Sequence, residues 1–201
     1  MKSYAFIDAS NLFYGGEKSL GWKIDYLKLI QYLKNKYGGT LKRNLRKAED
    51  AGIIIREGVQ PEDVTNYFRN ARGNELGHFS ESDYETLNRL QYAAIEKKSC
   101  FTLGAYDKNN SLIAAASFLP SHDRIVFLKG APTLEGREAH AMHCIMDNVI
   151  KKYSEQNLIL DFGGSVIPNV ARFNQSFGAE DYLYLLVKRN RLPFYIRWLK
   201  K

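Results

Sequence analysis

Hydrophobic positions along the chain switch between the spacing of helices and that of strands. In residues 40–51 and 81–98, apolar side chains recur every three or four positions, which predicts amphipathic helices. Short apolar runs such as residues 100–106 and 111–118 predict strands. The full prediction has helices at 25–37, 40–51, 61–72, 81–98, 134–153 and 168–177, and strands at 4–9, 53–56, 100–106, 111–118, 124–128, 158–162, 182–188 and 194–198.

Turn-forming residues connect these elements. Asp107, Asn109 and Asn110 lie between two predicted strands, which is typical of a hairpin turn. Three strands in close succession over residues 100–128 therefore predict an antiparallel meander. Gly178 follows the helix at residues 168–177 and predicts its end. The pattern shows no internal repeat, and it indicates one mixed α/β (α+β) arrangement.

Composition narrows the class of protein. The chain has 201 residues, of which 45% are hydrophobic and 25% charged, as in globular proteins that bury a core. Two cysteines, Cys100 and Cys144, are too few for a disulfide framework or a four-cysteine zinc site, so we expect a reduced, cytoplasmic protein. Asp8 interrupts the apolar start, and no apolar run reaches the length of a membrane span, so neither export nor insertion is expected.

The net charge of +7 suggests an anionic partner. Nucleic acid, a nucleotide cofactor and acidic lipid all fit this charge, and so does an ordinary solvated basic surface. The basic residues gather in one predicted helix and near the end of the chain: Lys42, Arg43, Arg46 and Lys47, with Lys188, Arg189, Arg191, Arg197, Lys200 and Lys201.

From residue 39 onward the order of elements resembles the GNAT acyltransferase fold. The sequence TLKRNLRKAEDAG at residues 40–52 is similar to a segment of Fem-type aminoacyltransferases and their GNAT-like relatives. The sequence IPNVARFNQSFGA at residues 167–179 is similar to the GNAT helix that follows the fifth strand. The resemblance implies a mixed, mostly antiparallel central sheet flanked by helices, and the transfer of an acyl or aminoacyl group to an amine.

The resemblance also implies where a donor binds. In GNAT proteins two strands splay apart, and their free backbone groups bind the pantetheine arm of acyl-coenzyme A. The phosphate-binding loop corresponds to residues 132–139, where glycine permits close backbone approach and arginine offers a positive charge. The donor-binding residues implied for this chain are Phe127, Leu128, Gly136, Arg137, Ala139 and Asn169.

Two positions depart from the family pattern. In the loop, only Gly136 matches the usual motif, and Thr133 and Glu138 occupy its other two positions. Many GNAT enzymes place a tyrosine that protonates the leaving thiolate where this chain has Asn174, and an amide has no proton to give at neutral pH. The catalytic residues therefore stay unassigned. The protein can still accelerate the transfer by holding the two reactants together in the right orientation.

The first 38 residues resemble the start of a NYN domain, a PIN-like nuclease family. The similar segments are FIDASNLFY at residues 6–14 and WKIDY at residues 22–26. The resemblance implies that Asp8 helps to hold Mg²⁺ or Mn²⁺ and that Asn11 lies near the metal, and Asp161 is a further candidate ligand. We therefore expect a NYN-like strand and helix at residues 1–38, joined at Gly38 to a GNAT-like domain at residues 39–201.

The predicted helix at residues 134–153 contains other groups that can bind metals. His143 and Asp147 are one helical turn apart, and His140 and Cys144 are close in sequence. The neighbouring apolar positions form a core stripe, so we interpret all four as packed or half-exposed residues and predict no zinc.

Three functions stay open at this stage. The first is an acyltransferase that takes its acyl group from acyl-coenzyme A, or an aminoacyl group from transfer RNA. The second is a metal-dependent ribonuclease that uses Asp8. The third is a non-catalytic fragment that binds nucleic acid through its basic residues.

Overall fold

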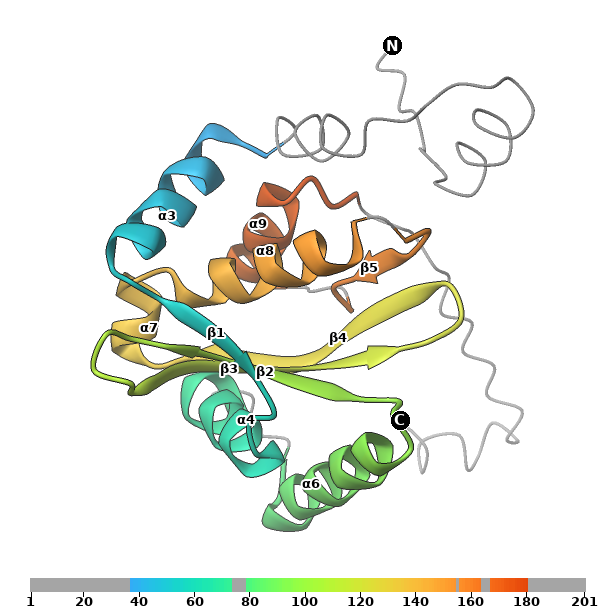
Figure 1. Ribbon diagram of the computed structural model, residues 1–201. Helices are drawn as coiled ribbons and strands as arrows, with labels where there is room; N and C mark the ends of the chain where they lie inside the picture. Colours follow the sequence, from blue (N-terminus) through green and yellow to red (C-terminus); the bar gives the residue numbers. More distant parts are fainter. Residues whose placement is uncertain (1–36, 74–78, 155, 164–166, 181–201) are drawn as a thin grey trace, which may run out of the picture.

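A five-stranded sheet forms the centre of the protein, seen in a computed structural model that describes residues 37–73, 79–154, 156–163 and 167–180 (Figure 1). The strands lie in chain order, with antiparallel pairing from β1 to β4 and parallel pairing between β4 and β5. This confirms the predicted mixed, mostly antiparallel fold. The strands are β1 (Ile54–Glu57), β2 (Phe101–Tyr106), β3 (Leu112–Pro120), β4 (Arg124–Pro132) and β5 (Ile159–Asp161).

Helices cover both faces of the sheet. On one face α4 packs against β3 and β4, and α6 packs against α4. On the other face α8 packs against the sheet, and α3 and α9 lie on the same side (Figure 1). The helices are α3 (Gly39–Asp50), α4 (Pro61–Phe68), a π-helical turn η2 (Arg69–Gly73), α6 (Glu81–Glu96), α7 (Leu134–Glu138), α8 (Ala141–Tyr153) and α9 (Pro168–Ser176).

Local sequence signals explain where several elements begin and end. Pro61 and Pro168 are the first residues of α4 and α9, where the missing backbone N–H costs nothing. Ser80 caps α6 in a capping box with Asp83. In the predicted hairpin, Asp107 Oδ1 accepts hydrogen bonds from the backbone N–H groups of Asn109 and Ser111 at 2.9 and 2.8 Å, which confirms the turn.

The main hydrophobic core lies between α8 and the sheet. Ile145 and Met146 of α8 are fully buried and belong to one cluster with Leu103 of β2, Phe118 of β3 and Ile125 of β4. Truncating one of these large side chains to alanine costs about 2–5 kcal/mol. A smaller cluster on the opposite face joins Val59, Val64 of α4 and Ala115 of β3. The layers that flank the functional site are therefore held rigidly.

The structure corrects two predicted elements and extends a third. The helix expected at residues 134–153 is divided into α7 and α8, and the helix expected at residues 61–72 ends as a π turn. The strand expected at residues 124–128 runs on to Pro132, because its pairing with β3 continues as far as Ala114.

Several predictions lie outside the described residues. These are the N-terminal strand, most of the helix at residues 25–37, and the two C-terminal strands. The domain boundary at Gly38 stays a prediction. Within the described ranges, no helix is both long and apolar enough to cross a membrane.

Candidate functional site

The edge of the sheet opens beside β4. Strand β5 pairs with β4 only at Arg124, Ile125 and Val126, and then ends at Asp161. Strand β4 continues to Pro132, and no strand among the described residues pairs with this part of its outer edge. Strand β4 therefore extends beyond the end of β5 and has an outer edge that no described strand covers.

A bulge in β4 lies at the same place. Phe127 pairs with Phe118 of β3, and Lys129 pairs with the preceding residue, Ser117, so Leu128 is an extra residue. Before the bulge Phe127 packs against the main core on the α8 face. After it Lys129 faces α4, where its ammonium lies over the ring of Phe68. Two residues apart in a regular strand would share a face, so the bulge is what places Phe127 and Lys129 on opposite faces of the sheet.

A cavity of about 460 Å³ occupies this opening. Its walls come from β4, from η2 and the end of α4, from α7 and the start of α8, and from α9. Predicted donor-binding residues among its lining are Phe127, Leu128, Gly136, Arg137 and Asn169, and Asn174 also lines it. The structure therefore brings these residues together around one space. Ala139 does not line the cavity, because it packs against the main core.

Gly136 is held against the neighbouring strand. Thr133, the N-cap of α7, accepts a hydrogen bond from the Gly136 N–H through Oγ1 at 3.1 Å, and its own N–H donates to the carbonyl of Ile113 at 2.9 Å. A Cβ atom on residue 136 would lie 1.9 Å from the carbonyl oxygen of Ile113, which is far inside van der Waals contact. Glycine is thus required here because α7 touches the backbone of β3.

The helix break falls at His140. The Ala139 N–H donates to the carbonyl of Glu135 and completes α7, and His140 then adopts a left-handed conformation with φ of 57°. This conformation is uncommon for residues other than glycine. It redirects the chain, so that α7 stays docked on β3 while α8 covers the core. The expectation of one continuous helix was wrong because this tertiary contact overrides local helix propensity.

The break places two histidines beside the cavity. The rings of His140 and His143 meet edge to face at 5.4 Å between centroids, and both residues line the cavity. Burial and the neighbouring His140 ring together lower the pKa of His143 to about 4. Burial and the charges of Lys47 and Arg43 lower the pKa of His140. Both imidazoles are therefore mainly neutral at pH 7, with a lone pair available to accept a proton.

The sequence analysis missed these histidines as functional residues. It interpreted them as helix residues among apolar neighbours, and His143 does lie half-buried between Phe173 and Phe177. His143 is half-buried and still lines the cavity, because Phe173, one of the rings that it contacts, lines the cavity too. No local sequence signal distinguishes this from an ordinary core position.

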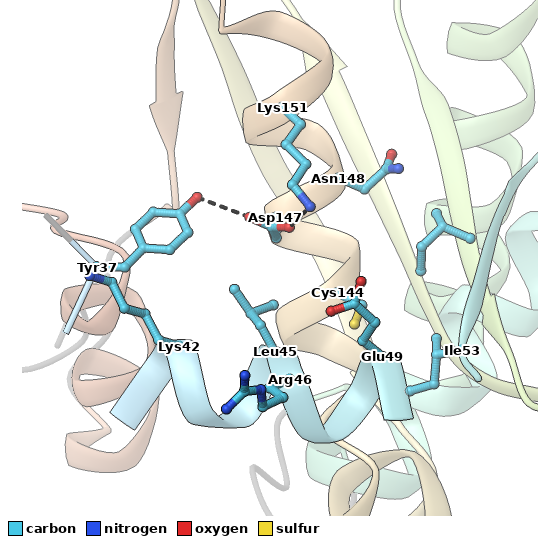
Figure 2. A pocket seen from close by; sticks show the side chains of 11 residues that line it. Tyr37, Lys42, Leu45, Arg46, Glu49, Ile53, Cys144, Asp147, Asn148 and Lys151 are labelled. Atoms are coloured by element: carbon cyan, nitrogen blue, oxygen red, sulfur yellow. Dashed lines mark hydrogen bonds and ion pairs between the residues drawn. The ribbon is translucent and has the colours of Figure 1, made fainter. Parts of the chain in front are cut away.

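A second cavity, of about 540 Å³, lies between α3 and α8 (Figure 2). Asp147, only 6% exposed, accepts a hydrogen bond from the Tyr37 hydroxyl and forms an ion pair with Lys151 at 2.5 Å. Figure 2 shows Tyr37 and Lys151 reaching Asp147 from different sides. Cys144 also lines this cavity, and burial raises its pKa to about 11, so its thiol is protonated at pH 7.

The metal ligands expected from the sequence divide between described and undescribed parts of the chain. Asp8 and Asn11 lie outside the described residues. Asp161 accepts a hydrogen bond from Arg124 at 3.3 Å and another from the Gly163 N–H at 2.8 Å. In the part of the chain that the structure covers, no three His, Cys, Asp or Glu side chains are placed to hold a metal ion.

Basic residues predicted to meet RNA divide between described and undescribed parts. Lys42, Arg43, Arg46 and Lys47 are exposed on α3, on the side of the sheet that α8 covers. The six basic residues from Lys188 to Lys201 lie outside the described residues.

Comparison with known proteins identifies the fold. No family model and no curated protein matches the sequence. A possible acetyltransferase from Clostridium difficile 630 superposes with a TM-score of 0.53 at 13% identity, over 70% of this chain and 99% of that chain. FemX superposes with a TM-score of 0.60 at 12% identity, over 74% of this chain and 55% of FemX. This chain therefore spans about half of the length of FemX.

A third solved structure is a predicted acetyltransferase from Clostridium acetobutylicum with acetyl-CoA. It gives a TM-score of 0.50 at 14% identity, over 68% of this chain and 96% of that chain. At such identities these likenesses establish the arrangement of elements. The described part of the chain therefore has the fold of GNAT-type acetyltransferases.

Proposed function

We propose that the protein is an N-acyltransferase, which moves an acyl group from an acyl thioester of the coenzyme A class to an amine. The observation that carries the proposal is the uncovered outer edge of β4 beyond the end of β5, with a cavity of about 460 Å³ beside it. Ligand cavities commonly measure roughly 300–1,000 Å³, so the space suits a small reactant or the reactive end of a larger one.

The walls of the cavity support an extended, amide-containing donor. The outer edge of β4 beyond Val126 has backbone groups that a pantetheine arm can pair with, as an added strand would. Phe127, Leu128 and Phe162 supply apolar contacts, and Asn169 supplies an amide. The guanidinium of Arg137 offers the fixed charge that phosphate groups require.

The histidines support the acyl-transfer step. An amine attacks the acyl carbon through its nitrogen lone pair, the C–N bond forms, and the C–S bond breaks to release a thiolate. A neutral imidazole of His140 or His143 takes the proton that the nitrogen loses. The thiolate gains a proton from the resulting imidazolium or from solvent, so the step balances. Asn174 contributes an N–H donor to this space but no acidic proton.

Two measurements test the donor site. Isothermal titration with acetyl-CoA is expected to show binding, and a thiol-release assay with a panel of primary amines is expected to show turnover. Arg137→Ala is expected to weaken acetyl-CoA binding by about tenfold or more, because a charge-assisted contact is lost. Arg172→Ala is the matched control, since Arg172 is exposed on α9 and does not line the cavity.

A cavity-filling variant makes the test specific. Val170 lines the cavity from α9, and Val170→Trp is expected to abolish acetyl-CoA binding while the circular dichroism spectrum is retained. The proposal is overturned if neither acetyl-CoA nor longer acyl donors bind and no thiol is released with any amine.

Aminoacyl transfer from transfer RNA is a second candidate. It is supported by the four exposed cations of α3 and by the likeness of the fold to FemX. Binding of aminoacyl-tRNA is expected to weaken steeply with salt, and Arg43→Glu with Lys47→Glu is expected to reduce it further. Affinity that stays constant between 50 and roughly 200 mM salt, where phosphate contacts lose most of their strength, would reject this candidate.

A further inference from the structure

The cavity beside β4 contains an unusual balance of charge. Four titratable side chains line it: Lys129, Arg137, His140 and His143. Neither aspartate nor glutamate is among its described lining residues. Because burial lowers the pKa of both histidines, the cavity holds two cations and two neutral bases. Such a site attracts an anionic reactant and repels a polycationic one.

Lys129 is the cation without an assigned role. Its side chain is half-buried on the α4 face of β4, where Nζ lies 4.4 Å from the ring centroid of Phe68 and 5.8 Å from that of Phe79. No hydrogen bond or ion pair of this ammonium occurs among the described residues. The rings stabilise the charge through their π faces, but they accept none of its three N–H bonds.

The acidic residue at the start of α6 is already paired. Glu81, at the start of α6, forms a two-point ion pair with Arg69 of η2, and the Arg69 guanidinium lies over Tyr84. Lys129 is therefore held in a defined place, with hydrogen-bonding capacity that the described residues leave unused. A desolvated ammonium of this kind gains most from a carboxylate that enters the cavity.

We infer that Lys129 binds the carboxylate of the acceptor, and that the acceptor is therefore an amine that also carries a carboxylate, as amino acids and small peptides do. This inference rests on the proposed function. In the proposed function, Arg137 binds the phosphates of the donor and the histidines take the proton of the amine. Lys129 is then the cation that can bind a second anionic group. A single ammonium matches the single charge of a carboxylate.

A binding test that needs no donor examines the inference directly. The probes are the N-acetyl derivatives of glycine, leucine and phenylalanine, each as the free acid and as the primary amide. Titration calorimetry is expected to show that at least one acid binds about tenfold or more tightly than its amide, the range of a charge-assisted contact. The preference is expected to vanish in Lys129→Gln and to persist in part in Lys129→Arg.

Lys108→Gln is the matched control, because Lys108 is exposed in the hairpin turn. All three variants, Lys129→Gln, Lys129→Arg and Lys108→Gln, are first compared with the wild type by circular dichroism and thermal unfolding. The inference is overturned if no acid is preferred over its amide, or if Lys129→Gln keeps the preference.

Kinetics then separate this inference from the proposed function. With acetyl-CoA as donor, kcat/KM for leucine is expected to exceed that for leucinamide and for spermidine, and Lys129→Gln is expected to lower only the value for leucine.

Turnover that favours spermidine or leucinamide would refute the carboxylate subsite while leaving the acyltransferase intact. A selective gain with succinyl-CoA, lost in Lys129→Gln, would assign Lys129 to the acyl group and also refute the inference. Absence of any donor binding would refute the proposed function, and the acid and amide probes still decide the role of Lys129.

Discussion

The Tyr37 hydroxyl donates a 3.2 Å hydrogen bond to Oδ1 of Asp147 and joins the residue before Gly38 to the centre of α8 (Figure 2). The ring of Tyr37 packs edge to face on Phe177, with centroids 5.9 Å apart. Burial raises the pKa of Tyr37, and the Asp147 carboxylate raises it further, so the hydroxyl stays a donor. One side chain thus connects the start of α3 to both α8 and the end of α9.

Tyr37→Phe removes this donor and keeps the ring. Asp147 then has Lys151 as its remaining partner, and we expect the free energy of unfolding to fall by about 1–2 kcal/mol. Urea unfolding at pH 7 measures the change. Tyr92→Phe is the control, because Tyr92 donates to Glu62 at the surface, where the loss of a hydrogen bond is expected to change stability less. Equal costs for the two variants would show that the contact with Asp147 adds no stability.

Stability is expected to depend on the protonation of His143. Its pKa is about 4 in the folded protein, against an ordinary value of 6.5, so the unfolded chain binds more protons between these two values. The free energy of unfolding should therefore fall as pH decreases from 6.5 to 4, by up to about 1.4 kcal/mol per pH unit for this one group. Denaturant unfolding from pH 4 to 7 measures the slope.

His143→Gln should flatten that slope, and His122→Gln, at an exposed position, is the matched control. His140 also has a lowered pKa and contributes in the same direction. An unchanged slope in His143→Gln would mean that this imidazole is not held neutral by the fold.

Gly136→Ala should damage the fold around α7. The added Cβ would lie 1.9 Å from the Ile113 carbonyl oxygen, so α7 must move away from β3. We expect a loss of at least about 3 kcal/mol, the upper range for overpacking, together with loss of acetyl-CoA binding. Gly39→Ala is the matched control, since nothing lies within 4 Å of its Cβ position. Alanine there should be neutral or stabilise α3 by up to about 1 kcal/mol.

Neither cysteine is expected to react as a nucleophile. Burial raises the pKa of Cys144 to about 11 and also raises the pKa of Cys100. Alkylation of Cys144 by iodoacetamide at pH 8 should therefore be at least about a hundredfold slower than that of glutathione, because the thiolate is the reactive form, and Cys100 should also react slowly. Both thiols should react fully in urea. Rapid labelling of the folded protein, located by mass spectrometry, would contradict the described burial.

Local sequence rules predicted most elements of this fold. The proline in the first turn of α4, the Asp107 turn and the glycine after α9 act within a few residues, so their effects follow directly from sequence. The helix break at His140 could not be predicted, since Ala139, His140 and Ala141 have no breaking signal. The break depends on contact between Gly136 and β3, which is remote in sequence.

The candidate site was only partly predictable for the same reason. Gly136 and Arg137 followed from the resemblance and from their chemistry, and they do line the cavity with Phe127, Leu128 and Asn169. Ala139 does not, because the break turns it toward the core. The role we infer for Lys129 needs Phe68 and Phe79, which are supplied by different segments of the chain.

Leu128 has a consequence for how this site can change. Because Leu128 is the extra residue of the bulge, a chain that lacks it would still pair Phe127 with Phe118 and Lys129 with Ser117. The side chains that follow would keep their faces, and Lys129 would stay beside Phe68. A deletion at position 128 should therefore straighten β4 in a single genetic step without removing the positive charge from the cavity wall.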